Sequence, residues 1–249
     1  MKIVVLGAWG FIGKTLVPVL EKAGHEVWYD LRTDADRVVH LGAPSSHEQF
    51  KWDMDGAFSN TINTFLRVVS FCKTNGIDLV YASSVTAEKK FTPYGKAKAI
   101  CEDISAAYEW GMGVRIACGY GPNESHKGEY ASVLYKFCNE MKEGRSPVIW
   151  GDGTQTRDFV YQDDIADTFL RILTTEPRMD CHVYTLRTGV ETSFNDLVRH
   201  INVTLGSDIQ PTYVNKPLTY VDSTTTGATN SLKDPMSIHD GIREVLGSL

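Results

Sequence analysis

The sequence is poor in the features that mark disulfide-stabilised, metal-binding and membrane-spanning proteins. The 249 residues include only five cysteines, scattered and without a CxxC pair: Cys72, Cys101, Cys118, Cys138 and Cys181. An odd, unclustered set favours reduced thiols in a cytoplasm-like compartment over a disulfide framework or a zinc site. No apolar run reaches the roughly 18 residues that a membrane-spanning helix needs. We therefore expect a cytoplasmic protein with no metal centre and no membrane partner.

An excess of positive charge is also missing. Lysine and arginine number 25 against 31 aspartates and glutamates, a net charge of −6, which argues against a general nucleic-acid binder. The hydrophobic fraction of 42% is that of an ordinary soluble globular protein. A chain of this length can bury a core without disulfides or metal ions to stabilise it. The apolar start, MKIVVLGAWGFIG, briefly resembles a signal peptide, but its glycines and the early Lys14 favour a buried strand.

The first half of the chain alternates short β-branched runs with segments of helical periodicity. Strands are expected at residues 2–7, 25–30, 37–43, 78–84 and 113–121. Helices are expected at residues 14–24, 54–74 and 95–110. This rhythm predicts an α/β fold, a Rossmann-like doubly wound parallel sheet with helices on both faces.

After Gly121 the rhythm breaks, which predicts a small second α/β domain. Helices are expected at 130–143, 163–175, 193–206 and 237–247, with a last strand at 181–189. No internal repeat or long linker interrupts this part. The spacing between the second and third strands is unusual, because residues 31–37 are too few for the dozen that a helical crossover takes. We predict that the usual outer strand and its helix are missing, leaving an open pocket edge with Asp34 or Asp36 as local polar groups.

A glycine-rich turn follows the first strand. Gly7, Gly10 and Gly13 lie in GAWGFIG, between a strand and a helix, where glycines let the backbone approach a pyrophosphate at the helix N-terminus. Asp30 ends the second strand and is placed to bind the ribose hydroxyls of a dinucleotide. This favours NAD over NADP, and Arg32 keeps NADP as the alternative.

The GxxGxxG spacing and the Tyr94-x-x-x-Lys98 pair resemble the extended short-chain dehydrogenase/reductase superfamily, in particular its NAD-dependent nucleotide-sugar epimerases and dehydratases. The resemblance covers nearly the whole chain, and GDGTQTRDFVYQDDIADTFL at 151–170 is its most specific segment. It implies an NAD-binding domain at 1–118 and 161–188 and a nucleotide-sugar-binding domain at 119–160 and 189–249. It also places Asn60 on the helix behind the active site. The cofactor-binding residues that it implies are Gly7, Gly10, Phe11, Ile12, Gly13, Asp30, Leu31, Arg32, Leu41, Gly42, Ala43, Tyr94 and Lys98.

Tyr94 and Lys98 are four residues apart and share a helix face. A neighbouring ammonium, together with the positive charge of oxidised nicotinamide, favours the phenolate, so we expect these two charges to lower the pKa of Tyr94. A serine hydroxyl from the preceding strand end can orient the substrate oxygen, and the resemblance gives that role to Ser84, with Ser83 as the alternative. The alternative is that Tyr94 and Lys98 form an ordinary surface pair on a helix.

The resemblance also implies a set of substrate-binding residues: Ser84, Thr86, Cys118, Arg157 and Lys216. Arg157 matches the family arginine that contacts the diphosphate, which suits its planar bidentate donors. A structural pair with Asp158 or Asp163 is the alternative. Two positions depart from the family pattern: Cys118 replaces an asparagine, and Lys216 stands near an expected arginine. Cys118 is more readily a packing residue than a nucleophile.

These residues favour an NAD-dependent nucleotide-sugar 4-epimerase, with a UDP-hexose as the expected substrate and a transient 4-keto intermediate. Val85 and Thr86 follow Ser84, where a dehydratase needs an Asp-Glu pair. The alternatives are a nucleotide-sugar reductase or dehydrogenase of the same family and a non-catalytic NAD-binding protein. The family commonly forms homodimers through the helices that bear Asn60 and Tyr94. Apolar residues on both permit this here: Phe65, Val69, Ile100 and Ile104.

Overall fold

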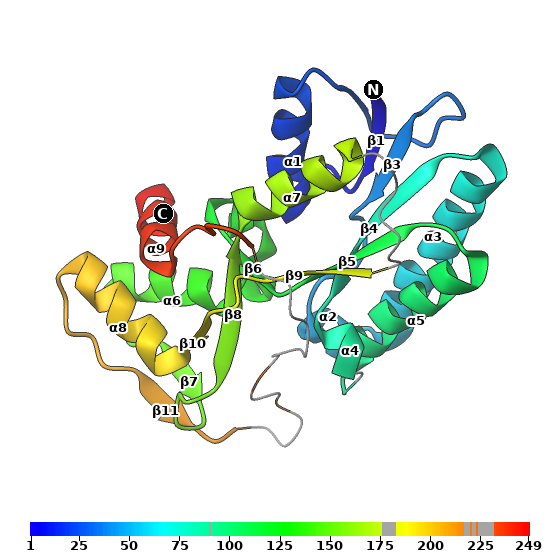
Figure 1. Ribbon diagram of the computed structural model, residues 1–249. Helices are drawn as coiled ribbons and strands as arrows, with labels where there is room; N and C mark the ends of the chain where they lie inside the picture. The colour runs from blue at the N-terminus through cyan, green and yellow to red at the C-terminus, as the bar shows by residue number, and fades with distance from the viewer. Residues whose placement is uncertain (90, 176–182, 217–219, 221–222, 224–231) are drawn as a thin grey trace. The chain divides into compact units, whose positions relative to one another are not determined.

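The chain forms two compact units, each made from two segments. The computed structural model describes residues 1–89, 91–175, 183–216, 220, 223 and 232–249 (Figure 1). The first unit joins Met1–Ile116 to Gln162–Leu186, and the second joins Ala117–Tyr161 to Arg187–Leu249. None of the described helices is both long and apolar enough to cross a bilayer.

The first unit is built on a six-stranded, wholly parallel sheet in the order β2-β1-β3-β4-β5-β9. Its strands are β1 (Lys2–Leu6), β2 (Glu26–Trp28), β3 (Arg37–His40), β4 (Asp78–Ser84), β5 (Met112–Ile116) and β9 (Val183–Leu186). The central strands are apolar on both faces, and Ile3, Val4 and Val5 of β1 are fully buried. Burial on both faces is what a parallel sheet between helical layers requires. The predicted doubly wound fold is confirmed.

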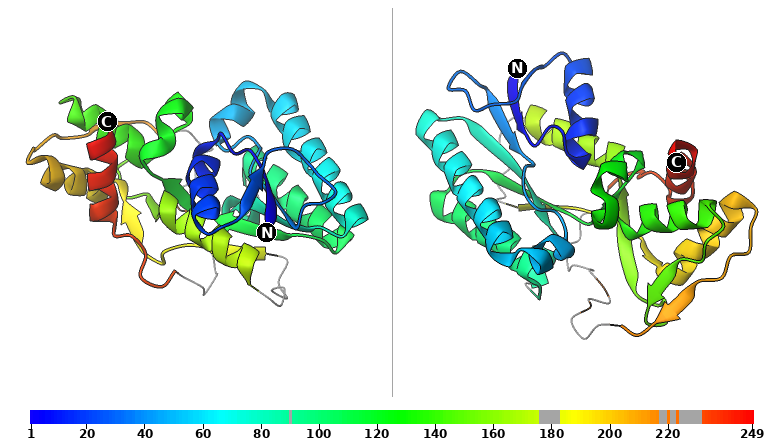
Figure 2. Two further views of the ribbon diagram at one scale, coloured as in Figure 1. Left: turned by 90° about the horizontal axis from the view of Figure 1, so that it is seen from above. Right: turned by 180° about the vertical axis from the view of Figure 1, so that it is seen from behind.

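Helices cover both faces of this sheet (Figure 2). They are α1 (Phe11–Lys22), α2 (His47–Trp52), α3 (Met54–Asn75), α4 (Thr86–Lys89), α5 (Pro93–Tyr108) and α7 (Gln162–Thr174). Helices α1 and α7 pack together on one face, and α3 and α5 on the other. The buried residues of α1, Gly13, Leu16 and Leu20, recur at helical spacing and face the sheet.

The predicted loss of the outer strand is confirmed within the described residues. β1 pairs with both β2 and β3, and β2 is the edge of the sheet. The short connection between β2 and β3 is held by Lys2, whose backbone N–H donates to Asp36 at 2.7 Å and whose ammonium contacts Asp34 at 3.1 Å. Both predicted polar groups of this edge are therefore engaged with the end of β1.

The second unit holds a three-stranded sheet in the order β10-β8-β6 and a two-stranded sheet of β11 and β7. Its strands are β6 (Cys118–Tyr120), β7 (Val148–Trp150), β8 (Thr156–Tyr161), β10 (Glu191–Ser193) and β11 (Thr212–Val214). Its helices are η1 (Pro122–Tyr130), α6 (Val133–Lys142), α8 (Phe194–Leu205) and α9 (Ile238–Ser248). Helices α6, α8 and α9 pack together around a core that includes Leu134, Leu197 and Ile242, all fully buried.

The expectation of one strand over 113–121 is wrong. The segment divides after Ile116, where β5 ends its pairing with β4 and β9 in the first unit. From Cys118 onward β6 pairs instead with β8 in the second unit. An apolar run marks extended chain, but the sequence does not show which partner strand each half has.

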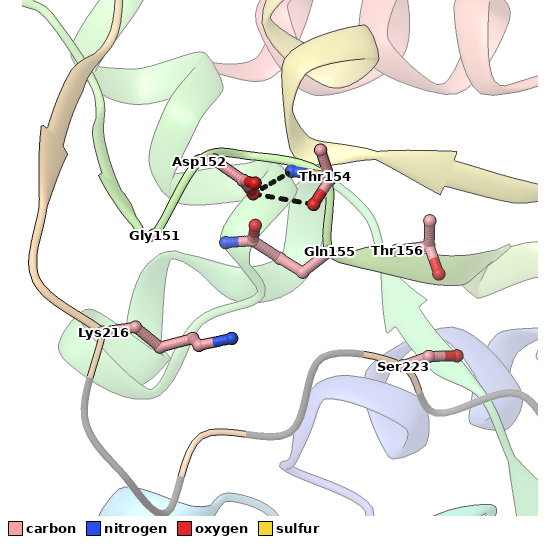
Figure 3. Close-up of a pocket in the computed structure, with 7 residues that line it drawn as sticks. All are labelled: Gly151, Asp152, Thr154, Gln155, Thr156, Lys216 and Ser223. Atoms are coloured by element: carbon pink, nitrogen blue, oxygen red, sulfur yellow. Dashed lines mark hydrogen bonds between the residues drawn. The ribbon is translucent and has the colours of Figure 1, made fainter.

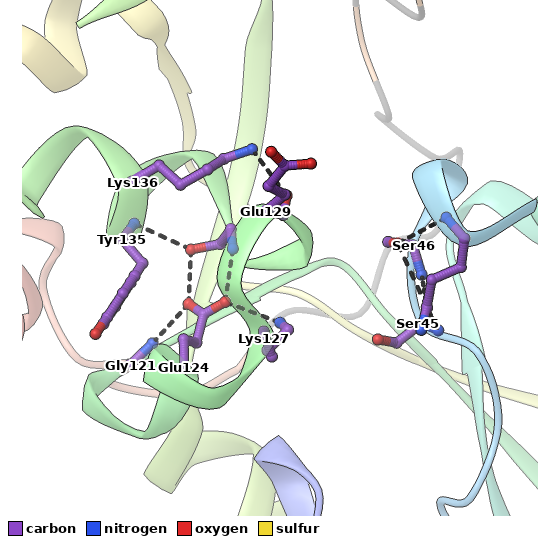
Figure 4. Close-up of polar contacts among 10 residues, drawn as sticks. Ser45, Ser46, Gly121, Glu124, Lys127, Glu129, Tyr135 and Lys136 are labelled. Atoms are coloured by element: carbon purple, nitrogen blue, oxygen red, sulfur yellow. Dashed lines mark hydrogen bonds and ion pairs between the residues drawn. The ribbon is translucent and has the colours of Figure 1, made fainter. Parts of the chain in front are cut away.

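A buried carboxylate organises the first turn of α6 (Figure 4). Glu124 is fully buried and accepts hydrogen bonds from the Ser132 hydroxyl at 2.7 Å and the Ser132 N–H at 2.6 Å. Lys127 supplies a countercharge at 2.8 Å, as a buried carboxylate needs. Ser132 in turn caps α6 through the Tyr135 N–H.

Candidate active site

The glycine turn packs against the carboxyl end of the neighbouring strand. Gly7 has a φ of +90°, and a Cβ there would lie 2.6 Å from the backbone nitrogen of Gly42. A Cβ on Gly13 would lie 2.4 Å from the Gly7 carbonyl oxygen. A larger residue at Gly7 would separate the turn after β1 from residues 41–43 after β3, and one at Gly13 would clash with the carbonyl oxygens of the turn itself.

The same turn fits the phosphates of a dinucleotide. Helix α1 begins at Phe11, and its N-cap residue Gly10 provides no side-chain hydrogen bond to the first turn. A Cβ on Gly10 would meet only the Gly7 carbonyl oxygen, at 3.3 Å. The start of α1 is thus shaped for an anion, which the backbone N–H groups and the helix dipole favour. β1 and β3 are also adjacent strands whose connections leave in opposite directions, the place where such sheets bind ligands.

The residues expected to meet the adenosine lie at the end of β2 and just after it. Asp30 is exposed, as a residue that binds ribose hydroxyls would be. Arg32 stacks over the Trp28 ring at 4.2 Å and contacts Asp34 at 3.4 Å. Trp9, within the glycine turn, stacks on Tyr29 with ring centroids 5.2 Å apart. The sequence reading missed this aromatic pair, although a tryptophan inside a glycine turn was a visible signal.

Ser84, Tyr94 and Lys98 meet at the carboxyl end of β4. Helix α5 begins at Pro93, and the Thr92 hydroxyl caps it by accepting from the Gly95 N–H at 3.1 Å, which places Tyr94 in the first turn. The Ser84 side chain is close enough to the Tyr94 phenol to act on its pKa, which it tends to lower. The Lys98 ammonium lies 5.9 Å from the Tyr94 ring centroid and donates to the Ala82 carbonyl at 3.2 Å. Tyr94 is half-buried and Lys98 is buried, so the two residues are not an exposed surface pair.

Thr86 joins the group of Ser84, Tyr94 and Lys98 through its hydroxyl, whereas Ser83 does not belong to it. The hydroxyls of Thr86 and Ser84 are 2.9 Å apart, and the Thr86 N–H donates to the Ser84 hydroxyl at 3.3 Å. The Ser83 hydroxyl faces the other side of β4 and donates to Glu102 at 2.5 Å. Alternation along a strand thus gives the phenol-facing position to Ser84.

The expected lowering of the Tyr94 pKa does not occur in the protein alone. Burial raises the pKa of the phenol to about 12, and the Ser84 side chain opposes that rise. Burial also lowers the pKa of Lys98, and the nearby charge of Glu102 opposes the change. The cost of charging a group in a poorly solvated site therefore sets the direction of both pKa changes.

Asn60 lies on α3, the helix that packs beside α5. Its side chain is exposed and accepts from the Thr64 hydroxyl at 3.3 Å. The next residue, Thr61, is buried and lines a small cavity of about 10 Å³ with His40 and Lys98. Burial and the Lys98 charge lower the pKa of His40 to about 4, so this imidazole is neutral at pH 7.

Two rings that the sequence reading missed hold Tyr94 from the side of α2. The centroids of His47 and Phe50 lie 5.5 Å and 5.8 Å from that of Tyr94, both edge-on. Edge-to-face packing of this kind fixes ring orientation. A capping box in which the Ser46 hydroxyl accepts from the Gln49 N–H begins α2, and S-x-x-Q was the sequence signal for it (Figure 4).

In the second unit, Arg157 lies on β8 among aromatic rings. Its guanidinium is 5.5 Å from the Phe194 ring centroid and 5.6 Å from that of Tyr220, and it donates to the Tyr220 hydroxyl at 3.4 Å. Asp158, one alternative partner, accepts instead from the Thr188 hydroxyl and the Gly189 N–H, at 2.7 Å and 2.9 Å.

Lys216 borders a pocket of about 420 Å³ in the second unit (Figure 3). The residues that line it are Gly151, Asp152, Thr154, Gln155, Thr156, Lys216 and Ser223. The Lys216 side chain extends from the segment after β11 toward Gln155, whose amide donates to the Trp150 carbonyl at 2.7 Å. Trp150 contacts Tyr220 edge-on at 5.6 Å. A cation that lines a pocket and an edge-on aromatic pair adjacent to it in the chain are groups that a nucleotide with phosphates would use.

Cys118 is a partly buried free thiol that packs against the core of the second unit. Burial raises its pKa to about 11, so the thiolate is scarce at neutral pH. This agrees with a packing residue. Among the described residues, no group of three histidine, cysteine or acidic side chains is arranged to hold a metal ion.

Comparison with known proteins places this geometry in a family. The model of the NAD dependent epimerase/dehydratase family matches residues 30–185. A Methanocaldococcus jannaschii protein with the name "Putative UDP-glucose 4-epimerase" is 31% identical over 195 residues, which are 67% of this chain and 61% of that protein. The match thus spans about three fifths of the relative's length.

Two solved structures share the fold. The UDP-glucose 4-epimerase of Thermotoga maritima with UDP-glucose has a TM-score of 0.84 at 22% identity, over 100% of this chain and 98% of that one. The UDP-glucuronic acid 4-epimerase of Bacillus cereus, in complex with UDP-glucuronic acid and NAD, has a TM-score of 0.86 at 20% identity, over 100% and 98%. With the family model matching more than half of its length, the chain belongs to the NAD dependent epimerase/dehydratase family.

Proposed function

We propose that this protein is an NAD-dependent nucleotide-sugar 4-epimerase that acts on a UDP-hexose through a transient 4-keto sugar. The observation that carries the proposal is the joined set of Ser84, Tyr94 and buried Lys98 at the carboxyl end of β4, in a chain whose family is shown. The ligands named for the two solved relatives, UDP-glucose in one and UDP-glucuronic acid with NAD in the other, support the substrate class and the cofactor.

The side chains of the first unit perform the proton transfer. Bound NAD would supply the hydride acceptor and donor for the sugar C4 and, in its oxidised form, a positive charge in the site. Tyr94 takes the proton of the C4 hydroxyl and later gives it back. Ser84 and Thr86 hold and orient that oxygen, and Lys98 holds the ribose of the cofactor and stabilises the phenolate. Because the protein alone raises the pKa of Tyr94 to about 12, proton abstraction by Tyr94 depends on this added charge.

The second unit supplies the residues that we assign to the nucleotide. Arg157 and Lys216 provide cationic donors for the diphosphate, and the Trp150–Tyr220 pair provides aromatic surface for the base. The Cys118 position lacks the amide of an asparagine, so we propose that it contributes contact area and no hydrogen bond to the sugar. Asp30 directs the cofactor choice to NAD, because the additional phosphate of NADP would face its carboxylate.

We also propose a cytoplasmic homodimer that pairs through the surface of α3 and α5. Two of the apolar residues first considered for this contact are unsuitable, because Phe65 and Val69 face the sheet and are buried in the unit's own core. Ile100 on α5 and Met54 on α3 are exposed at 37% and 49% and remain available. Light scattering of the purified protein tests this, and a monomer with full activity would contradict it.

Conversion of UDP-sugars tests the proposed activity directly. Incubation with UDP-glucose, UDP-galactose and their N-acetyl and uronic forms should show inversion at C4 by NMR, with no net NADH. Tyr94→Phe should lower the rate at least about 100-fold, because it removes the proton-transferring hydroxyl and leaves the ring packing intact. The exposed Tyr213→Phe, in the second unit, is the control and should keep full activity. Steady accumulation of NADH would instead indicate a dehydrogenase.

A further inference from the structure

A buried ion pair lies directly behind the catalytic strand end. Glu102 on α5 is 8% exposed, and its carboxylate accepts hydrogen bonds from Arg115 Nε at 2.9 Å and Arg115 Nη2 at 2.6 Å. The Ser83 hydroxyl donates to the same carboxylate at 2.5 Å. This bidentate, charge-assisted arrangement is geometrically specific. The mechanism derived above uses none of these three side chains.

Two side chains of α5, Lys98 and Glu102, bind successive residues of β4. Lys98 donates to the Ala82 carbonyl, and one helical turn later Glu102 binds the Ser83 side chain. Ser84, whose side chain acts on the Tyr94 phenol, is the next residue of the strand. Two polar anchors one turn apart leave the helix little freedom to slide or rotate on the strand, so they set the separation of Ser84 and Tyr94.

The Arg115 guanidinium also contacts the short helix α4, which lies between Ser84 and Tyr94 in the sequence. Arg115 Nη1 lies 3.8 Å from the Glu88 carboxylate on α4. Helix α4 begins at Thr86, whose hydroxyl contacts Ser84. Arg115 on β5 therefore contacts both α4, which lies within the ten-residue link from Ser84 to Tyr94, and α5, which begins at its end. A link this short transmits displacement at either end to the site.

We propose that Glu102, clamped by Arg115 and Ser83, is a positioning residue that sets Ser84 against Tyr94 and orients Lys98 in the active site. The inference rests on the proposed function and deepens it. Glu102 acts through its neighbours and contacts neither substrate nor cofactor. Its charge has a second effect, because it opposes the burial that disfavours the Lys98 ammonium.

Several titratable groups surround Lys98 and contribute to any pH dependence. On the elements packed around it these are His40 of β3, Tyr81 of β4, Tyr94, Cys101 and Glu102 of α5, with Arg115 of β5 behind Glu102. Glu102 is the carboxylate among them. Replacing it with glutamine should move deprotonation of Lys98 to lower pH, because the remaining neighbours are cationic or neutral at pH 7.

Glu102→Gln is the principal test, with kcat, KM and the pH profile measured on the full-length protein. We expect kcat to fall between about 10- and 100-fold, the size of effect that small misplacements produce, with KM for the UDP-sugar within about twofold. The alkaline limb of kcat should move to lower pH. Arg115→Lys keeps a positive charge but loses the fork, so kcat should fall without that movement of the limb.

A matched ion pair provides the control for a purely structural role. Arg37 and Asp78 join β3 to β4 at the opposite ends of the strands, 3.2 Å apart, with the arginine as exposed as Arg115 and the carboxylate more exposed than Glu102. Asp78→Asn should lower the Tm while kcat and its pH profile stay unchanged. If Glu102→Gln has wild-type kcat, or loses no more activity than Asp78→Asn at an equal loss of Tm, the positioning role is overturned.

Two further measurements keep the outcome decisive. If Glu102→Gln does not fold, Ser83→Ala removes one anchor and leaves the ion pair. It should lower kcat about 3- to 10-fold, and wild-type kcat would contradict the proposal.

If the wild-type protein converts no nucleotide sugar, the proposed function fails by itself. NMR titration of ¹³C-labelled Lys98 then tests the inference alone, because an unchanged titration in Glu102→Gln overturns it.

Discussion

At the scale of single residues, burial controls the ionisation of the active-site groups. Tyr94 and Lys98 are each pushed toward their neutral forms, the phenol by a raised pKa and the amine by a lowered one. The Tyr94 phenol therefore keeps its proton until a further positive charge in the site favours the phenolate. In a nicotinamide enzyme this couples proton abstraction to cofactor binding, so the free protein carries no reactive phenolate.

His40 gives a prediction at this scale. Its pKa is about 4 in the folded protein and about 6.5 when unfolded, so it favours folding above pH 6.5 and that contribution is lost as the pH falls toward 4. Between pH 7 and 4.5, His40→Gln should lose less unfolding free energy than the wild type, by on the order of 2–3 kcal/mol. Urea titrations at both pH values measure the difference. His25→Gln, whose imidazole is half-buried, should change it far less, and equal pH dependence of wild type and His40→Gln would refute the assignment.

At the scale of elements, the junction of α4 and α5 depends on a glycine. A Cβ on Gly95 would lie 2.5 Å from the Thr86 carbonyl oxygen, a backbone atom that cannot rotate away. This close approach allows ten residues to bring the end of β4 and the first turn of α5 together. The residue that follows the catalytic tyrosine therefore serves the packing of two helices.

Gly95→Ala should destabilise the protein by about 1–3 kcal/mol and lower kcat, because α5 must move away from α4. The matched control is Gly247→Ala near the end of α9, where a Cβ meets nothing within 4 Å. Glycine to alanine in an open helical position should be neutral or stabilise by up to about 1 kcal/mol. Thermal unfolding and the epimerase assay compare the two variants. Equal stability of both would show that the clash is relieved without cost.

At the scale of the whole molecule, cofactor binding should stabilise the fold. A ligand at 100 times its Kd adds about 2.7 kcal/mol, which for a chain of this length corresponds to a rise in Tm of about 5–10 °C. We expect NAD to produce this rise, and NADP at equal concentration to produce a smaller one, because of Asp30. Asp30→Asn should narrow the difference between the cofactors. Equal shifts with both in the wild type would contradict the role of Asp30.

Much of this architecture could be predicted from the order of residues alone. Alternating apolar runs and helical periodicities determine a parallel α/β sheet, because buried strands and amphipathic helices leave strong local patterns. The glycine turn, the Tyr94–Lys98 spacing and the seven-residue link after β2 are also local. They predicted the phosphate turn, the shared helix face and the missing outer strand.

The tertiary structure decided what depends on residues distant in sequence. It assigned the two halves of 113–121 to different sheets, placed Thr61 beside the cavity at Lys98, and raised the Tyr94 pKa that local charge alone would lower. It also joined Glu102 to Arg115, 13 residues away, and to Ser83, 19 residues away. Strand partners, burial and ion pairs are set by packing across the fold, and single-chain patterns carry little information about them.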